Sequence, residues 1–379
     1  MKDNKLIYFP GLNGLRAIAA IAVVISHITI SLKQFNLNPY IFGALKDGSP
    51  RGLTLAEFGV SIFFVLSGFL ITYLLQAEKK IRQIDIPKFY IRRILRIWPL
   101  YYFYLPIAIA VLIAFKLIPD FKMLLFYIFF AADIPSILKR QIVLVGHYWS
   151  LGVEEQFYLF WPWVNKKINS LVPFLVVVII LLIILKLTFH FLYPGTIKDN
   201  IFQVARFHCM MIGALGAVLY KKENPLFLVV TDNKIIQFIS WTIIFLAAFN
   251  KFHIWSIIDN EIISVVALFI IIGQVRIKNR IINLEVPVMD FLGKISYSIY
   301  VIHPLIIFFF AKTMKLQVIA TPFQYIIIYF VIISSTIFLS FLSYTYIEKY
   351  FLRYKKRFEI VKSSGSRPRL FGALPSVLY

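Results

Sequence analysis

Apolar runs of about 20 residues recur along the whole chain, and they constrain its fold more than any other feature. The protein has 379 residues, of which 60% are hydrophobic and 17% aromatic. In lipid, only helices and closed barrels satisfy their own backbone hydrogen bonds. The runs lack the alternation of polar and apolar residues that is typical of a barrel strand. The sequence therefore predicts an all-α, polytopic membrane protein.

About ten transmembrane helices are expected from these runs. A shorter apolar stretch, Met123 to Ala132, cannot cross a membrane and is followed by Asp133 and Pro135. We expect it to form a re-entrant or interfacial element on the outer side, where irregular backbone is tolerated beside a cavity. The expected spans cover residues 12–32, 55–76, 97–118, 148–165, 170–190, 203–220, 235–250, 255–273, 290–311 and 323–347.

The net charge of +22 comes mostly from Lys and Arg in short segments between the apolar runs. This distribution is the positive-inside signal and indicates contact with anionic lipids, not with nucleic acid. It predicts that both termini are cytoplasmic. Because Arg16 and His27 interrupt the first run, we interpret it as a retained transmembrane helix and not as a signal peptide. Residues 1–350 are expected to form one transmembrane domain, and residues 351–379 a flexible, basic cytoplasmic tail.

The first span, Leu12 to Leu32, carries two ionisable residues, Arg16 and His27. Eleven residues bring the helix back to within about 20° of the same face and raise it by roughly 16 Å. Arg16 is therefore expected near one water interface and His27 near the middle of the bilayer. Ionisable residues at such depth are costly, which favours a functional role. Desolvation favours the neutral imidazole, the form that acts as a general base, although a structural hydrogen bond to a neighbouring helix remains open.

A basic segment precedes the third span and contains Lys88, Arg92, Arg93 and Arg96. Arg93 and Arg96 are three residues apart, so they share one face of a helix. Guanidinium groups match phosphate oxygens, and this segment could bind a nucleotide-like cofactor. The alternative is a topology anchor at the membrane surface.

The segment from His147 to Pro162 places polar side chains at the start of an aromatic helix. Ser150, Glu154 and Tyr158 recur every four residues and share a face, whereas Glu155 points about 100° away. Glu154 could pair with Arg16 or orient His27, and Glu155 could contact substrate or solvent. A structural ion pair between helices is the alternative.

A last polar face lies in the ninth expected span and consists of Ser296, Tyr300 and His303. Function and simple polar contacts between helices are equally compatible with it. The remaining histidines, His190, His208 and His253, and the single cysteine, Cys209, are expected to be loop or packing residues. The sequence has no His/Cys cluster at metal-ligand spacing, and no metal site is expected.

Taken in order, these segments resemble the membrane-bound acyltransferase-3 family, the sugar O-acetyltransferase type without a fused esterase-like domain. Each motif alone is weak, but the ordered set is specific and covers Leu12 to Ile347. The matching residues are Arg16 and His27, Phe63 to Ile71 with Ser67 and Gly68, Arg93 and Arg96, Trp149 with Glu154, Tyr158 and Pro162, and Ser296 with Tyr300 and His303.

The resemblance implies transfer of an acyl group, usually acetyl from cytoplasmic acetyl-CoA, to a hydroxyl of a cell-surface or exported carbohydrate. O-antigen, exopolysaccharide and peptidoglycan are typical acceptors, and the bacterial inner membrane is the implied location. Because no esterase-like domain is recognised in this sequence, a separate extracytoplasmic partner or direct transfer would complete the reaction.

This resemblance assigns roles to the polar residues. His27, Glu154 and Arg16 are the expected catalytic group, and Arg93, Arg96, Arg92 and Lys88 are expected to bind CoA. The substrate-binding or supporting residues would be Trp149, Ser150, Glu155, Tyr158, Tyr300 and His303. Direct attack is favoured over an acyl-histidine intermediate. A transporter or flippase that uses the same intramembrane residues is the rival function, and a silent scaffold for polysaccharide synthesis is a third.

Overall fold

The structure, a computed structural model, describes residues 7–44, 48, 50–314, 322–361 and 363–364. Nearly all regular structure in these residues is helical, as predicted. The two strands, β1 (Ile7–Tyr8) and β2 (Ser363–Ser364), pair in parallel and bring the two ends of the described chain together.

Seven helical segments of the described chain are long and apolar enough to cross a membrane, or eight if the bent pair α10 and α11 forms one span. The protein is therefore an all-α, polytopic membrane protein. The seven are Leu12–Phe35, Thr54–Ile81, Ile86–Ala114, Leu171–Leu192, Ile197–Lys221, Ser296–Thr313 and Pro322–Phe358. The bent pair is α10 (Pro225–Thr231) with α11 (Lys234–Ala248), at 57°.

This number is smaller than the predicted ten because two expected spans form helices that are too polar. They are α6 (Trp149–Lys167), which carries Glu154 and Glu155, and α12 (Asp259–Arg276), which begins with Asp259 and Glu261. Both helices still pack inside the bundle, α6 against α2 and α3, and α12 against α2 and α9. Packing against protein, not lipid, allows these helices to keep polar side chains.

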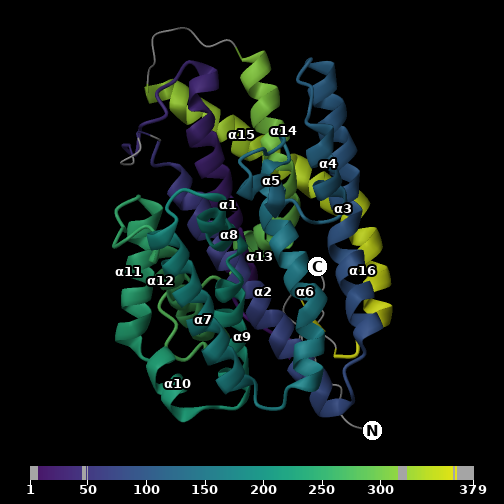
Figure 1. The fold of residues 1–379 in the computed structure, drawn as a ribbon, viewed down its shortest axis with the longest axis vertical. Helices are drawn as coiled ribbons and strands as arrows, with labels where there is room; N and C mark the ends of the chain where they lie inside the picture. Colours follow the sequence, from purple (N-terminus) through teal and green to yellow (C-terminus); the bar gives the residue numbers. More distant parts are fainter. Residues whose placement is uncertain (1–6, 45–47, 49, 315–321, 362, 365–379) are drawn as a thin grey trace, which may run out of the picture.

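The centre of the bundle is formed by α1 (Leu12–Ser31), α2 (Leu53–Ile81) and α9 (Phe207–Lys221) (Figure 1). Glycines bring the backbones of α2 and α9 into contact. A Cβ atom on Gly68 would lie 1.9 Å from the carbonyl oxygen of Met210, and one on Gly213 would lie 2.1 Å from that of Val65. Small residues at such crossings permit the close packing that associates helices in membranes.

On one side of this centre, α3 (Ile86–Ala114) runs beside the short helix α4 (Phe121–Ile128) (Figure 1). Asp85 caps α3 by accepting a hydrogen bond from the backbone N–H of Lys88. The expected short element at 123–132 corresponds to α4 and the turn before α5 (Asp133–Ile137). The other helices of the bundle are α7 (Leu171–Leu192), α8 (Ile197–Ala205), α13 (Pro287–Lys294), α14 (Ser296–Thr313) and α15 (Pro322–Ser343).

A buried ion cluster joins α7, α9 and α12. Lys186 donates to Glu261 at 2.6 Å and to the carbonyl oxygen of Ile257 at 2.5 Å. The Nε2 atom of His208 lies 2.9 Å from the same carboxylate. Ionisable side chains inside a membrane protein usually pair with one another in this way. The contact of His208 with Glu261 therefore joins two helices and is a packing interaction. Cys209 is buried beside it.

The chain continues in regular structure after α15. A π-helical turn (Tyr344–Glu348) leads into α16 (Lys349–Lys355) and a 3₁₀ turn (Lys356–Phe358), and α16 packs against α3. Within the predicted flexible tail, residues 351–358 are thus helical and lie against α3, and residues 363–364 form β2. Residues 365–379, the rest of that prediction, lie outside the described residues.

Candidate active site

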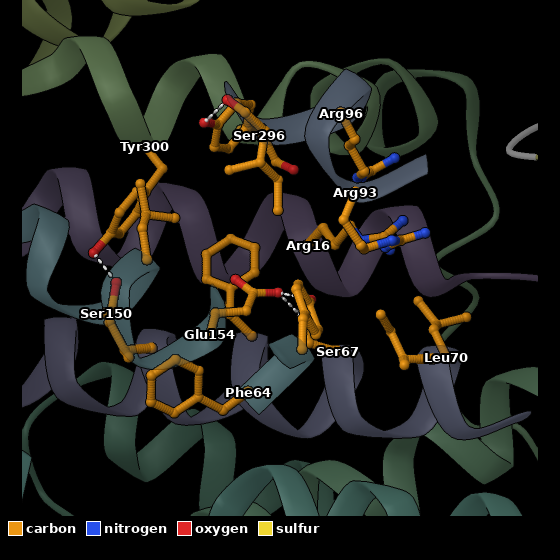
Figure 2. A pocket seen from close by; sticks show the side chains of 17 residues that line it. Arg16, Phe64, Ser67, Leu70, Arg93, Arg96, Ser150, Glu154, Ser296 and Tyr300 are labelled. Carbon is orange, nitrogen blue, oxygen red and sulfur yellow. Dashed lines mark hydrogen bonds between the residues drawn. The ribbon is translucent and has the colours of Figure 1, made fainter. Parts of the chain in front are cut away.

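Five helices, α1, α2, α3, α6 and α14, line a partly open pocket, here called the inner cavity, which has a volume of about 780 Å³ when the open solvent at its mouth is included (Figure 2). It brings together seven of the predicted site residues, which come from four separate sequence motifs. These are Arg16, Arg93, Arg96, Ser150, Glu154, Tyr158 and Tyr300. The remaining polar lining includes Ser67, Ser296 and Tyr297.

Three arginines gather at one end of the inner cavity, as Figure 2 shows. Arg16 donates to the side-chain oxygen of Asn13 at 3.3 Å. Arg93 lies over the rings of Phe89 and Tyr158, and its Nε is buried without a hydrogen-bond partner in the described chain. Within the described residues, no carboxylate lies within salt-bridge distance of any of these three guanidinium groups. Unpaired guanidinium groups in a cavity are suited to binding an anion.

Glu154 is the single carboxylate among the described lining residues of the inner cavity. Its Oε1 accepts hydrogen bonds from the hydroxyls of Ser67 and Tyr158. In the described chain Glu154 contacts neither His27 nor Arg16, the two partners considered for it, because α2 and α6 hold its carboxylate on the hydroxyls of Ser67 and Tyr158. Glu155 points elsewhere, as its position on the helix predicts, and accepts from the indole of Trp98 at 3.2 Å.

His27 lies in a second, more open space of about 1130 Å³, here called the outer hollow. Its Nδ1 is 2.7 Å from Nε2 of His303, and Nδ1 of His303 in turn faces the carbonyl oxygen of Ile299 at 3.0 Å. His147, from the 3₁₀ turn Gly146–Tyr148, also lines the hollow, and its ring centre is 5.3 Å from that of His303. The walls of the outer hollow also carry the polar side chains of Gln34, Gln141 and Lys312.

A small hydrogen-bonded group separates the two spaces. Tyr300 and Ser150 line the inner cavity and lie 2.6 Å apart through their hydroxyl groups, at the end opposite the arginines (Figure 2). The Tyr300 hydroxyl also lies 2.8 Å from the carbonyl oxygen of His147, which lines the outer hollow. The described linings of the two spaces share no residue. This group therefore links the lining of the inner cavity with that of the outer hollow.

Five predicted site residues are absent from the linings of both spaces. Two of them, Glu155 and His303, are described above, and the other three are Arg92, Lys88 and Trp149. Arg92 pairs with Glu78 at 3.2 Å and donates to the carbonyl oxygen of Phe358 at 2.9 Å. Lys88 pairs with Asp85 at 3.2 Å and is half-exposed. Trp149 packs edge-on against Phe64, with the guanidinium of Arg206 over its ring. A role in binding or catalysis for these three stays a prediction.

Ser67 and His147 line the two spaces, and the sequence analysis named the segments that contain them without giving either residue a role. Ser67 is the polar residue in an apolar run just before Gly68, which is a usable signal. His147 directly precedes the Tyr-Trp-Ser segment, but a histidine at the start of a helix is not diagnostic by itself. Its proximity to His303 depends on the tertiary fold, which joins residues 156 positions apart.

The sequence of this chain is similar to a known protein family and to several known proteins. A family model described as "Acyltransferase domain" matches residues 9–345. A protein of Staphylococcus aureus (strain COL) that is named, provisionally, an O-acetyltransferase is 28% identical over 398 aligned residues, which is 97% of this chain and 60% of the relative. The O-acetyltransferase OatA of Staphylococcus aureus (strain NCTC 8325 / PS 47) is 27% identical over 79% of this chain and 51% of its own length. The chain thus spans about 60% or less of these relatives. No solved structure matches it significantly.

Proposed function

We propose a reaction for this chain on the basis of its family, since it belongs to the membrane-bound acyltransferase-3 family. In this proposal it transfers an acyl group from a CoA thioester to a hydroxyl of a carbohydrate outside the cytoplasm. The observation that carries this proposal is the set of three arginines without ion-pair contacts among the described residues, at one end of the inner cavity. Acetyl is the proposed acyl group, because the relatives are named O-acetyltransferases.

Arg93 and Arg96 are the proposed phosphate ligands. They lie on the first turns of α3, next to the basic segments that the positive-inside rule assigns to the cytoplasm. A donor bound there by its phosphates would direct the pantetheine arm along the cavity, past Glu154, toward Ser150 and Tyr300. Both termini would be cytoplasmic, in agreement with the pairing of β1 with β2, and the bacterial inner membrane is the proposed location.

The acceptor is proposed to enter from the outer hollow. Amide, hydroxyl and imidazole groups on its walls, including Gln34, Gln141 and Ser31, are the kind of partners that carbohydrate hydroxyls require. His27 would take the proton of the acceptor hydroxyl, while His303 holds the orientation of its ring. The hydroxyl oxygen would then attack the thioester carbonyl, the C–S bond would break, and CoA would leave as the thiol after taking up a proton.

Direct transfer of this kind requires the two spaces to connect. Because Tyr300 and Ser150 stand between them, the Tyr300 side chain would have to move when donor and acceptor are both bound. Arg16 would stabilise the developing negative charge on the thioester oxygen or on Glu154. An acyl-histidine intermediate on His27 remains the alternative route, and label that stays on the protein in the absence of acceptor would favour it.

Binding of acetyl-CoA to the purified chain in neutral detergent tests this proposal. A charge-assisted hydrogen bond to phosphate contributes about 1.5–3 kcal/mol, so each lost arginine should weaken binding about ten- to a hundredfold. Arg93→Gln and Arg96→Gln are the test variants. Lys80→Gln, which changes an exposed lysine in the last turn of α2, is the matched control. Unchanged affinity in both arginine variants would contradict the donor assignment, and transport without any thioester consumption would favour the rival transporter function.

A further inference from the structure

The C-terminal segment after α15 is fastened to the cytoplasmic end of the proposed donor site. Arg92 forms the fastening, because its guanidinium donates to the Phe358 carbonyl and pairs with the buried carboxylate of Glu78. Glu78 in turn accepts from the backbone N–H of Asp85 at 2.7 Å. This arrangement joins α2, α3 and the C-terminal segment at a single point.

Lys355 is the basic residue of this segment that points inward. Its side chain is 15% exposed, whereas Arg353, Lys356 and Arg357 on the same short stretch are exposed to solvent. A lysine with an apolar stem normally extends its ammonium group to water. The inward orientation therefore requires a compensating interaction.

Lys355 lines a smaller space of about 440 Å³ together with Glu78, Arg92, Arg93 and Glu359. Arg93 also lines the inner cavity, so the two spaces meet at its side chain. Taken together, the two linings contain five basic and three acidic residues in the described chain. The nearest acidic partner of Lys355, Glu359, is 3.5 Å from its Nζ.

Like charges gather at this position. Lys355 and Arg93 line the smaller space together, and Arg93 and Arg96 line the inner cavity together. Positive charges that share a partly desolvated site repel one another in the empty protein. The buried, unpartnered Nε of Arg93 is a second sign that the site is incomplete without a ligand. An anion with several charges placed among the three residues would turn this repulsion into attraction.

We propose that Lys355 is a further phosphate-binding residue of the donor site, and that the C-terminal segment forms one wall of that site. The ligand class is a nucleotide-bearing thioester, held through its diphosphate or its ribose phosphate. This inference rests on the proposed function, in which Arg93 and Arg96 bind the same donor. It also assigns a purpose to the Arg92 fastening, which keeps Lys355 in place.

The test compares Lys355→Gln with Lys356→Gln in the full chain, purified in neutral detergent. Lys356 is the next residue, equally charged and exposed. Titration calorimetry with CoA and with acetyl-pantetheine, which lacks the nucleotide phosphates, separates phosphate binding from the rest of the site. We expect Lys355→Gln to weaken CoA binding about tenfold and to leave acetyl-pantetheine unchanged, Lys356→Gln to change both less than twofold, and Lys355→Arg to bind CoA like the wild type.

A second variant tests the same idea without removing the lysine. Glu359→Gln frees Lys355 from its acidic partner and should strengthen CoA binding a few-fold. It also covers the case in which Lys355→Gln fails to fold. Titration with vesicles of phosphatidylglycerol separates a lipid headgroup from the donor, because a lipid site would respond to these vesicles and not to CoA.

Three results would separate failure of this inference from failure of the proposed function. If the arginine variants lose CoA binding while Lys355→Gln and Glu359→Gln match the wild type, Lys355 is not a ligand and the proposed function stands. If phosphatidylglycerol binding alone depends on Lys355, the site belongs to lipid and the inference is overturned. If the folded wild type does not bind CoA at all, the proposed function fails, and the inference with it.

Discussion

The substitution Gly68→Ala should disturb both the bundle and the site, because Gly68 lies where α2 touches α9. The added Cβ would be 1.9 Å from the carbonyl oxygen of Met210, whereas real Cβ contacts stay above 3.0 Å. The two helices would therefore have to separate by the difference, 1.1 Å. The obstacle is a backbone atom, which cannot rotate away as a side chain can.

A gap of 0.5–1 Å already removes about a quarter to a half of the dispersion energy of each contact that it opens. Overpacking of a buried position costs about 1–3 kcal/mol, and the rigid obstacle places Gly68→Ala near the upper end of that range. Gly213→Ala should cost a similar amount, since its Cβ would lie 2.1 Å from the Val65 carbonyl oxygen. Because both changes open the same contact, the double variant should lose less than the sum of the two.

Unfolding by a denaturing detergent, followed by tryptophan fluorescence, measures these free energies relative to the wild type. Gly146→Ala is the control, because its added Cβ would meet nothing closer than 3.5 Å. Equal stability of Gly68→Ala and Gly146→Ala would refute the packing argument, and so would full additivity of Gly68→Ala with Gly213→Ala.

Three further predictions concern the hydrogen-bonded group around Tyr300, the attachment of the C-terminal segment by Arg92, and the cap of α3. Tyr300→Phe removes the hydroxyl that bonds Ser150 and the His147 carbonyl, so thioester hydrolysis without acceptor should rise several-fold in a thiol-release assay. Tyr297→Phe, which lines the same cavity, is its control. Arg92→Gln should release the C-terminal segment, and limited trypsin digestion should then cleave faster at Arg353 and Arg357; an unchanged rate would refute the fastening. Asp85→Ala should cost about 1 kcal/mol at neutral pH, because Asp85 caps α3. The hydrogen bond from the backbone N–H of Lys88 lowers the pKa of Asp85 in the folded protein. The stability that Asp85 contributes is therefore fully present above the ordinary pKa range of a carboxyl group, and it disappears as the pH falls through the pKa of the folded state. A destabilisation by Asp85→Ala that does not change with pH would contradict this prediction.

The sequence predicts much of the inner cavity because the motifs follow helical periodicity. Ser150, Glu154 and Tyr158 recur every four residues, and the structure places all three on one lining. Arg93 and Arg96 face the same cavity, as their spacing indicates. Local geometry is enough for such sets, since a helix fixes which of its own residues share a face.

Partners on different helices could not be predicted in the same way. His27 and His303 are 276 positions apart, and the sequence suggested Glu154 as a candidate partner of His27. The axial rise of roughly 16 Å between Arg16 and His27 nevertheless agrees with their separate places, Arg16 in the inner cavity and His27 in the outer hollow. Lys355 was interpreted as part of a basic tail, because a run of Lys and Arg after a span is typical of a topology anchor. Only its inward orientation in the folded chain distinguishes it from its neighbours.

Seven or eight helical segments of the described chain are apolar enough to span a membrane, against about ten predicted, and the difference has a related reason. Hydropathy along the chain does not distinguish a helix that faces lipid from one that packs inside the bundle with polar side chains. The two helices concerned, α6 and α12, carry Glu154 and Glu261, whose partners lie on neighbouring helices. Those partners come from distant parts of the chain, so the cost of burying each carboxylate could not be judged from its own segment.

In the proposed mechanism the donor binds in one space and reacts at a histidine that lines another. His27→Gln separates these two steps when CoA binding and thioester consumption are measured on the same purified protein with acceptor present. We expect CoA affinity to stay within twofold of the wild type, since the inner cavity does not include His27. Acceptor-dependent CoA release should fall about a hundredfold or more, as expected for loss of a general base. Unchanged CoA release in His27→Gln would refute the mechanism.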